Sequence, residues 1–146
     1  MSGNSENLSR VERRLSTADR WECIHFADHV RRADVLALGE RGFYVAEIPG
    51  SALASAEALF ADISGAFVFP GYFGANWDAL ADCLADLEWL KGDRFVLLIN
   101  GASQLTEPLG RLIEVWLSAA QEWSVEGTPF HLVVLRDDPA TVDDTH

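Results

Sequence analysis

The most constraining feature of the sequence is a nearly continuous apolar run from Arg94 to Asn100. Such a run is typical of a parallel β-strand that is covered on both faces, because each side chain along it then meets a core. Two further runs, at 43–48 and 130–135, are rich in β-branched and aromatic residues. Helix-patterned segments separate the three runs. We therefore predict an α/β fold with a small parallel sheet of three strands covered by helices.

Helices between these strands are predicted from apolar residues spaced three and four apart. One helix begins at Ser51 or Ser55, either of which can cap it, and another begins at Thr106, where Glu107 and Pro108 complete a standard helix start. The apolar stripes of the two helices are Leu53, Ala56, Leu59, Phe60 and Ile63, and Leu109, Leu112, Ile113, Trp116, Ala120 and Trp123.

The two ends of the chain lack a core-forming pattern. Residues 1–19 are polar with little periodicity, which predicts a disordered segment, and residues 137–146 form an acidic tail. Since 146 residues is the length of one domain, we predict a single domain at 20–136. Within it, a short strand at 21–26 would add an edge strand to the sheet, and a helix is expected at 30–38.

The charge of the chain bears on its partner. The formal net charge is -12 and the isoelectric point is near 4.5, which argues against nucleic acid or an anionic membrane as the direct partner, because phosphate binding relies on clustered Lys and Arg. A basic partner is favoured instead. No apolar run reaches the length of a membrane span and the N-terminus has no signal-peptide pattern, so we expect a cytoplasmic protein.

The cysteines and histidines give no sign of a catalytic or metal site. Cys23 and Cys83 lack metal-ligand spacing and are expected to be reduced, buried thiols. His25 and His131 lie in apolar runs and are expected to be structural rather than catalytic. No phosphate-binding glycine loop is present, so we expect neither an enzyme nor a bound cofactor.

A turn-rich aromatic loop runs directly into a helix at 69–87. Asn76 is a preferred N-cap, so the helix should begin there, with Trp77, Leu80, Leu84 and Leu87 on its apolar side. Asp78, Asp82 and Asp86 fall on the opposite side at i, i+4 spacings, where like charges cost roughly 0.2 to 0.5 kcal/mol per pair. Two interpretations follow: a solvated acidic face, or an exposed anionic ridge beside Tyr72 and Phe73 that meets a cationic partner.

Asp78 and Asp82 also allow a third interpretation. Their carboxylates are close enough in sequence to share a divalent cation, which is the strongest catalytic alternative that the residues offer. A hard-cation site needs more oxygen ligands, however, and no third acidic motif accompanies this pair in the sequence. We therefore expect no metal site.

The run Phe-Pro-Gly-Tyr-Phe-Gly-Ala-Asn-Trp-Asp-Ala-Leu-Ala-Asp-Cys-Leu at 69–84 resembles the signature segment of the barstar family, intracellular inhibitors of a secreted bacterial ribonuclease. The match is ungapped, and from about Phe43 to Leu135 the order of elements also looks like barstar. The resemblance implies a three-stranded parallel sheet with helices packed around it.

The resemblance also implies a binding site. By motif position, Asp82 falls on the aspartate that takes the place of a substrate phosphate, Asp78 on an earlier interface aspartate, and Tyr72 on the interface tyrosine. Gly74 and Asn76 match loop positions that shape the same contact. With the neighbouring Phe73, these residues form the expected partner-binding set: Tyr72, Phe73, Gly74, Asn76, Asp78 and Asp82.

Two departures from the family pattern bear on the partner. Ala81 stands where barstar carries a tryptophan, and Trp77 replaces a leucine on the core side. A later helix of barstar contributes a glutamate, for which both Glu114 and Glu122 are candidates. We expect a protein that is a monomer when free and that forms a 1:1 complex with a basic, extracellular-type ribonuclease, as an antitoxin or immunity protein of a bacterium. The alternative is a barstar-fold interaction module for a different partner.

Overall fold

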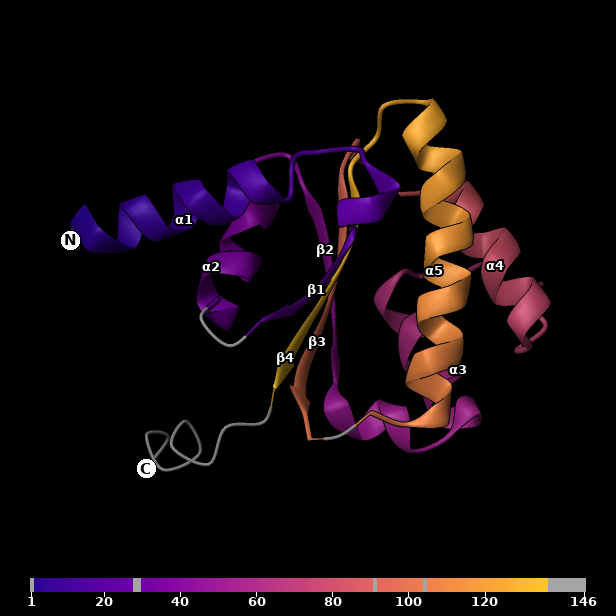
Figure 1. Ribbon diagram of the computed structural model, residues 1–146. Coiled ribbons are helices and arrows are strands. Elements are labelled where there is room, and N and C mark those ends of the chain that lie inside the picture. Colours follow the sequence, from indigo (N-terminus) through magenta and orange to yellow (C-terminus); the bar gives the residue numbers. More distant parts are fainter. Residues whose placement is uncertain (1, 28–29, 91, 104, 137–146) are drawn as a thin grey trace.

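The computed structural model describes residues 2–27, 30–90, 92–103 and 105–136. Its centre is a sheet of four strands that are all parallel, in the order β1-β4-β3-β2 (Figure 1). The strands are β1 (Ile24–Ala27), β2 (Tyr44–Pro49), β3 (Phe95–Ala102) and β4 (Phe130–Arg136). The predicted α/β class and the three main strands are confirmed, and β1 is the additional edge strand. It is shorter than predicted, because Arg20–Glu22 form a 3-10 turn in which the Asp19 side chain accepts from the backbone N–H of Trp21.

Helices cover both faces of the sheet (Figure 1). One face is covered by α3 (Ala56–Ala66), α4 (Trp77–Asp86) and α5 (Glu107–Val125), and the other by α1 (Ser2–Arg14) and α2 (Arg32–Ala37), which continues as a 3-10 turn at Leu38–Glu40. Ser55 rather than Ser51 caps α3, since its side chain accepts from Ala58 N at 3.1 Å. Ser51 is part of a further 3-10 turn, at Gly50–Ala54.

Two hydrophobic cores lie on the two faces of the sheet. Along β3, Phe95, Leu97 and Ile99 belong to the core under α3, α4 and α5, whereas Val96 and Leu98 belong to the core under α1 and α2. All five side chains are at most 2% exposed. The strand therefore reads as continuously apolar because alternate residues enter different cores.

The predicted disorder of residues 1–19 is wrong for the part of this segment that the structure describes. Residues 2–14 form α1, with Leu8 and Val11 packed against a buried Leu15 in the core under α1 and α2. The spacing of these three residues places them on one side of the helix, and a salt bridge of 2.6 Å joins Glu12 to Arg41. The apolar stripe consists of only these three residues. Because polar residues separate them in the sequence, the segment showed no clear helical periodicity. The predicted acidic tail at 137–146 lies outside the described residues.

Gly50 is required where β2 ends. A Cβ atom at this position would lie 2.2 Å from the carbonyl oxygen of Gly101, beside the irregularity in β3 between Asn100 and Ala102. Gly101 itself has a φ of 87°, which favours glycine. The close approach of these two backbones fixes the turn that leads from the sheet toward α3.

Candidate binding surface on helix α4

Aromatic side chains anchor the loop between α3 and α4. Phe73 packs edge-on against Phe69, with ring centroids 4.9 Å apart, and against Phe60 at 6.3 Å. The indole N–H of Trp89 donates to the carbonyl oxygen of Phe67 at 2.9 Å, which satisfies a backbone acceptor left free at the end of α3. The loop is therefore held by the core rather than by its own backbone alone.

Two non-glycine residues with left-handed backbone conformation bound this loop. Val68 and Ala75 both have a φ of 52°. Such conformations cost a non-glycine residue on the order of 1 kcal/mol, and they persist only where the surroundings impose them. The aromatic packing and the cap of α4 supply that constraint on either side.

Asn76 begins α4 as predicted and also closes the loop. Its Oδ1 atom accepts from the backbone N–H of Ala79 at 2.8 Å, and its Nδ2 atom donates to the carbonyl oxygen of Gly74 at 3.3 Å. A Cβ atom on Gly74 would lie 3.2 Å from that Nδ2 atom, so a side chain there would press on the cap. Asn76 thus couples the shape of the loop to the start of the helix.

One side of α4 is fixed in the core. Leu80, Leu84 and Leu87 are at most 1% exposed, and Leu87 ends the helix in a left-handed conformation. The indole N–H of Trp123 on α5 donates to the carbonyl oxygen of Leu84 at 2.8 Å. Trp77, at the first turn, is half-buried and packs edge-on against Phe60. The helix therefore has little freedom to rotate or shift.

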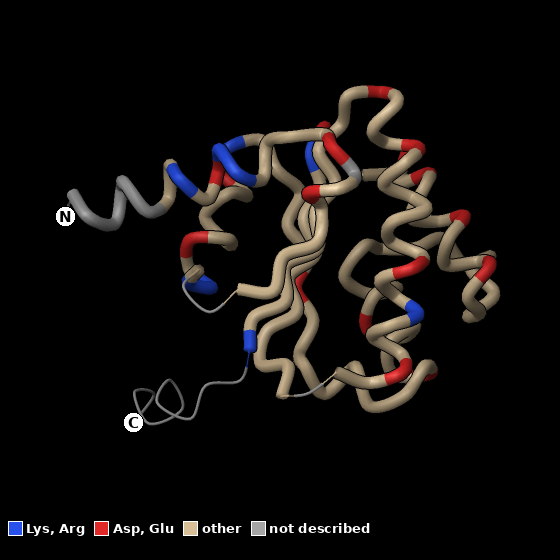
Figure 2. Tube along the Cα trace, in the orientation of Figure 1, with Lys and Arg blue, Asp and Glu red and all other residues tan. Residues whose placement is uncertain are grey.

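The opposite side of α4 carries the acidic surface, which we define as Tyr72, Asp78, Asp82 and Asp86. Asp78 and Asp82 are exposed, Asp86 is partly buried, and Tyr72 is 73% exposed. The pKa of Tyr72 lies above its ordinary value because of desolvation and the negative charges of Asp86, Cys83 and Glu88 nearby. Figure 2 shows acidic positions along both α4 and α5. The tyrosine and the aspartates thus share one face of the molecule.

The structure separates Phe73 from the other expected site residues. Tyr72 points outward, whereas the Phe73 ring is half-buried among aromatic neighbours and supports the loop from inside. The charges of Asp86 and Glu88 act on the pKa of Tyr72, although Tyr72 precedes α4 and both acidic residues lie at or beyond its far end. Only the geometry of the loop brings Tyr72 toward that end of the helix.

Helix α5 runs beside α4 and carries both candidate glutamates. Arg111 lies with its guanidinium carbon 5.3 Å from the centre of a Trp77 ring, so Glu114, one turn further on, lies beside the first half of α4. Glu122 precedes Trp123, which contacts Leu84, and so lies beside the second half. Both glutamates are exposed. Arg111 is therefore a basic group at the contact between α5 and the first turn of α4, on the side of Trp77.

Cys83, next to Asp82 on α4, adds no exposed thiol to this surface. It is buried, and burial together with the charges of Asp82 and Asp86 raises the pKa of its thiol, so the thiol is a poor nucleophile. Among the described residues, no group of three His, Cys, Asp or Glu side chains is placed to hold a metal ion. In the same residues, no helix combines the length and apolar character that a membrane span requires.

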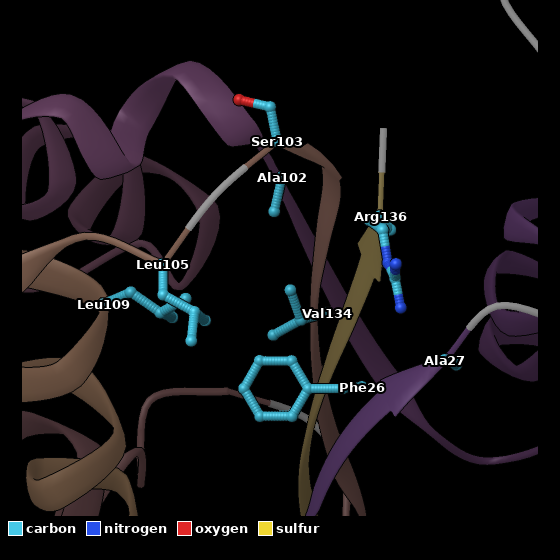
Figure 3. Close-up of a pocket in the computed structure, with 8 residues that line it drawn as sticks. All are labelled: Phe26, Ala27, Ala102, Ser103, Leu105, Leu109, Val134 and Arg136. Atoms are coloured by element: carbon cyan, nitrogen blue, oxygen red, sulfur yellow. The ribbon is translucent and has the colours of Figure 1, made fainter. Parts of the chain in front are cut away.

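The acidic surface is not part of either of two cavities found elsewhere in the molecule. One, of about 380 Å³, lies at the carboxyl ends of β1, β3 and β4, where Phe26, Val134, Leu105 and Leu109 surround it (Figure 3). The other, of about 370 Å³, lies under α1. The acidic surface is therefore exposed rather than enclosed, which suits contact with a macromolecule better than with a small ligand.

Comparison with known proteins identifies the family. No curated protein matches the chain. The family model described as Barstar (barnase inhibitor) matches residues 43–135, a stretch that runs from just before β2 to the end of β4 and contains the whole loop and α4. Because this match covers more than half of the chain, and the parallel sheet and its helices agree with it, the protein belongs to the barstar family.

Proposed function

We propose that this protein inhibits a basic ribonuclease in a 1:1 complex, by covering the active site of the enzyme with the acidic surface. The observation that carries the proposal is the placement of Asp82 and Asp78: both are exposed, on a helix whose opposite side is almost completely buried. Asp82 takes the place of a substrate phosphate, and Asp78 and Tyr72 contact the surroundings of the active site.

The chemistry of the target supports this role. A ribonuclease holds Arg, Lys and His around the scissile phosphate, and a carboxylate that reaches this cluster forms charge-assisted hydrogen bonds with it. Because α4 is already fixed by Asn76, Leu80 and Leu84, little conformational entropy is lost when the partner binds. The net charge of -12 speeds the encounter with a basic enzyme.

A second candidate function rests on Ala81. The resemblance places a tryptophan there, and the alanine between Asp78 and Asp82 leaves the acidic surface without a large apolar contact at its centre. The loss of a central aromatic contact costs on the order of 2 kcal/mol or more. This favours a partner whose own surface fills that space, either a different ribonuclease or a toxin or protein of another class.

The test is a titration of the protein into a panel of barnase-type ribonucleases, with RNA cleavage as the measurement. We expect inhibition that is complete at one equivalent and that the Asp82→Ala variant loses. A separate competition experiment uses the ribonuclease, RNA and the inhibitor together. The inhibitor should prevent RNA from binding to the ribonuclease, and RNA should weaken the binding of the inhibitor to the ribonuclease. Absence of inhibition of every ribonuclease tested would contradict the proposal and favour the interaction module. Binding without exclusion of RNA would contradict the occlusion mechanism.

A further inference from the structure

The second cavity, under α1, has the composition of a ligand site. Its volume of about 370 Å³ falls in the range of small-molecule sites. The inner part is apolar and belongs to the core under α1 and α2: Val11, Leu15, Val30 and Val133. All elements that form it except β4 precede residue 43, so most of this cavity lies outside the stretch that matches the family.

Two arginines of α1 line the same cavity. Neither Arg10 nor Arg14 forms an ion pair with any side chain that the structure describes, from residue 8 onward, although acidic residues outnumber basic ones by 23 to 11 in the chain. Their i, i+4 spacing places two like charges together, at a cost of roughly 0.2 to 0.5 kcal/mol to the helix. The helix dipole stabilises the positive charge of Arg14 in the last turn, but it stabilises that of Arg10, one turn earlier, much less. Local helix stability does not account for the pair.

The other ionisable side chains that line the cavity are either hydrogen-bonded or uncharged. The carboxylate of Asp34 is buried and accepts hydrogen bonds from the guanidinium of Arg31 at 3.3 and 3.4 Å. Burial, the neighbouring His131 and the charge of Arg14 lower the pKa of His25 to about 4, so the ring is neutral at pH 7. Among the described residues that line the cavity, the charges without a partner are therefore the two guanidinium groups at its edge. Figure 2 shows basic positions gathered on α1 and α2, on the side of the molecule away from α4.

We propose that this cavity binds an amphipathic organic anion, with its carboxylate or sulfonate on Arg10 and Arg14 and its apolar body against Val11, Leu15 and Val133. The volume suits an apolar chain of roughly eight to twelve carbons. Arginine is suited to the anionic group because its planar guanidinium binds a carboxylate in a bidentate manner. The cavity of Figure 3 is a poorer candidate, since Ser103 and Arg136 are the only polar residues in the described part of its lining and Arg136 already has an interaction partner.

The proposal is tested with the full-length protein and two probes. Fluorescence of 8-anilinonaphthalene-1-sulfonate reports binding, and sodium octanoate is the competitor, with 1-octanol as its neutral counterpart. We expect saturable binding of one probe molecule, displaced by octanoate at much lower concentration than by 1-octanol. The Arg10→Gln, Arg14→Gln double variant should lose at least roughly tenfold in affinity, which corresponds to 1.4 kcal/mol. The matched control, Arg13→Gln, changes an exposed arginine of the same helix that does not line the cavity and should bind as the natural protein does.

Further measurements test where the ligand binds and whether its negative charge matters. Octanoate should shift the nuclear magnetic resonance signals of the His25 ring, because His25 lines the cavity. The Leu105→Ser variant, which alters the cavity of Figure 3, should bind the probe normally. Lack of saturable binding, equal loss in Arg13→Gln, loss in Leu105→Ser, or equal displacement by 1-octanol would each overturn the proposal. None of these outcomes depends on ribonuclease inhibition, since α4 lies on the other side of the sheet.

Discussion

The Nε2 atom of His25 lies 2.9 Å from the Nδ1 atom of His131. The Nε2 atom of His131 in turn lies 2.7 Å from the carbonyl oxygen of Thr17, which can only accept, so this nitrogen donates. A neutral His131 then accepts at Nδ1 from the N–H of His25. This chain of hydrogen bonds joins β1 to β4 and attaches the segment before β1 to the sheet. It requires an unprotonated Nδ1 on His131, and the burial of both rings favours their neutral forms.

Acid should therefore weaken the fold. Burial is the largest cause that lowers the pKa of both rings, and the pKa of His25 is about 4 against 6.5 in an unfolded chain. Between these values the unfolded state binds more protons, so stability is full above pH 6.5 and falls as pH decreases toward 4. For His25 we expect a loss of about 1 to 2 kcal/mol after allowance for solvent screening. Urea unfolding at pH 7 and pH 4.5 measures it. His25→Gln, which retains an N–H donor but does not titrate, should show a smaller pH dependence, and an unchanged dependence would contradict the assignment.

Replacement of Asn76 should weaken both the helix and the loop. Asn76→Ala removes the acceptor for Ala79 N–H and the donor to Gly74, and we expect a loss of about 1 kcal/mol in the free energy of unfolding. Asn76→Asp keeps the acceptor and should recover most of that stability. Chemical denaturation compares the three proteins. If the aspartate variant is as unstable as the alanine variant, the cap is not the source of the effect.

Asp82 and Asp86 should differ in their contribution to partner binding. Asp82→Ala leaves the cationic cluster of the partner without its carboxylate, and the expected loss is about 3 kcal/mol, roughly a hundredfold in affinity. Asp86→Ala changes a partly buried position nearer the end of α4 and should cost less than about 1 kcal/mol. Calorimetric titration measures both, with circular dichroism to verify folding. Equal losses in two folded variants would mean that diffuse charge, not the position of Asp82, determines binding.

Two glycine substitutions should have opposite effects. Gly50→Ala places a Cβ atom 2.2 Å from a backbone oxygen, which forces β2 and β3 apart and should destabilise the protein by about 2 kcal/mol or more. Gly65→Ala lies in α3 with open space around the added carbon, and should stabilise it by up to about 0.5 to 1 kcal/mol. Thermal unfolding distinguishes them. A Gly50→Ala variant as stable as the natural protein would show that this backbone contact can relax.

The sequence patterns predicted those elements whose stability is local or whose residues enter a single core. Asn76, Thr106 and the β3 run were identified because capping and continuous burial leave direct signatures. The helix at Ser2–Arg14 was missed because it depends on contacts with a core that its own sequence does not reveal. Phe73 was placed beside Tyr72 at the surface because adjacent aromatic residues look alike in sequence. Their opposite directions result from the turn between Pro70 and Phe73.

The two cores on either side of the sheet have an evolutionary consequence. Substitutions in the acidic surface and substitutions under α1 share no contacts, and the free-energy effects of such separated changes are expected to add rather than interact. The partner preference of α4 can therefore change in evolution whether or not the arginines of α1 are retained. The arginines of α1 can likewise be lost without an effect on α4. Related sequences that differ in the acidic surface but share the arginines of α1, or the reverse, would show that the two surfaces evolve independently.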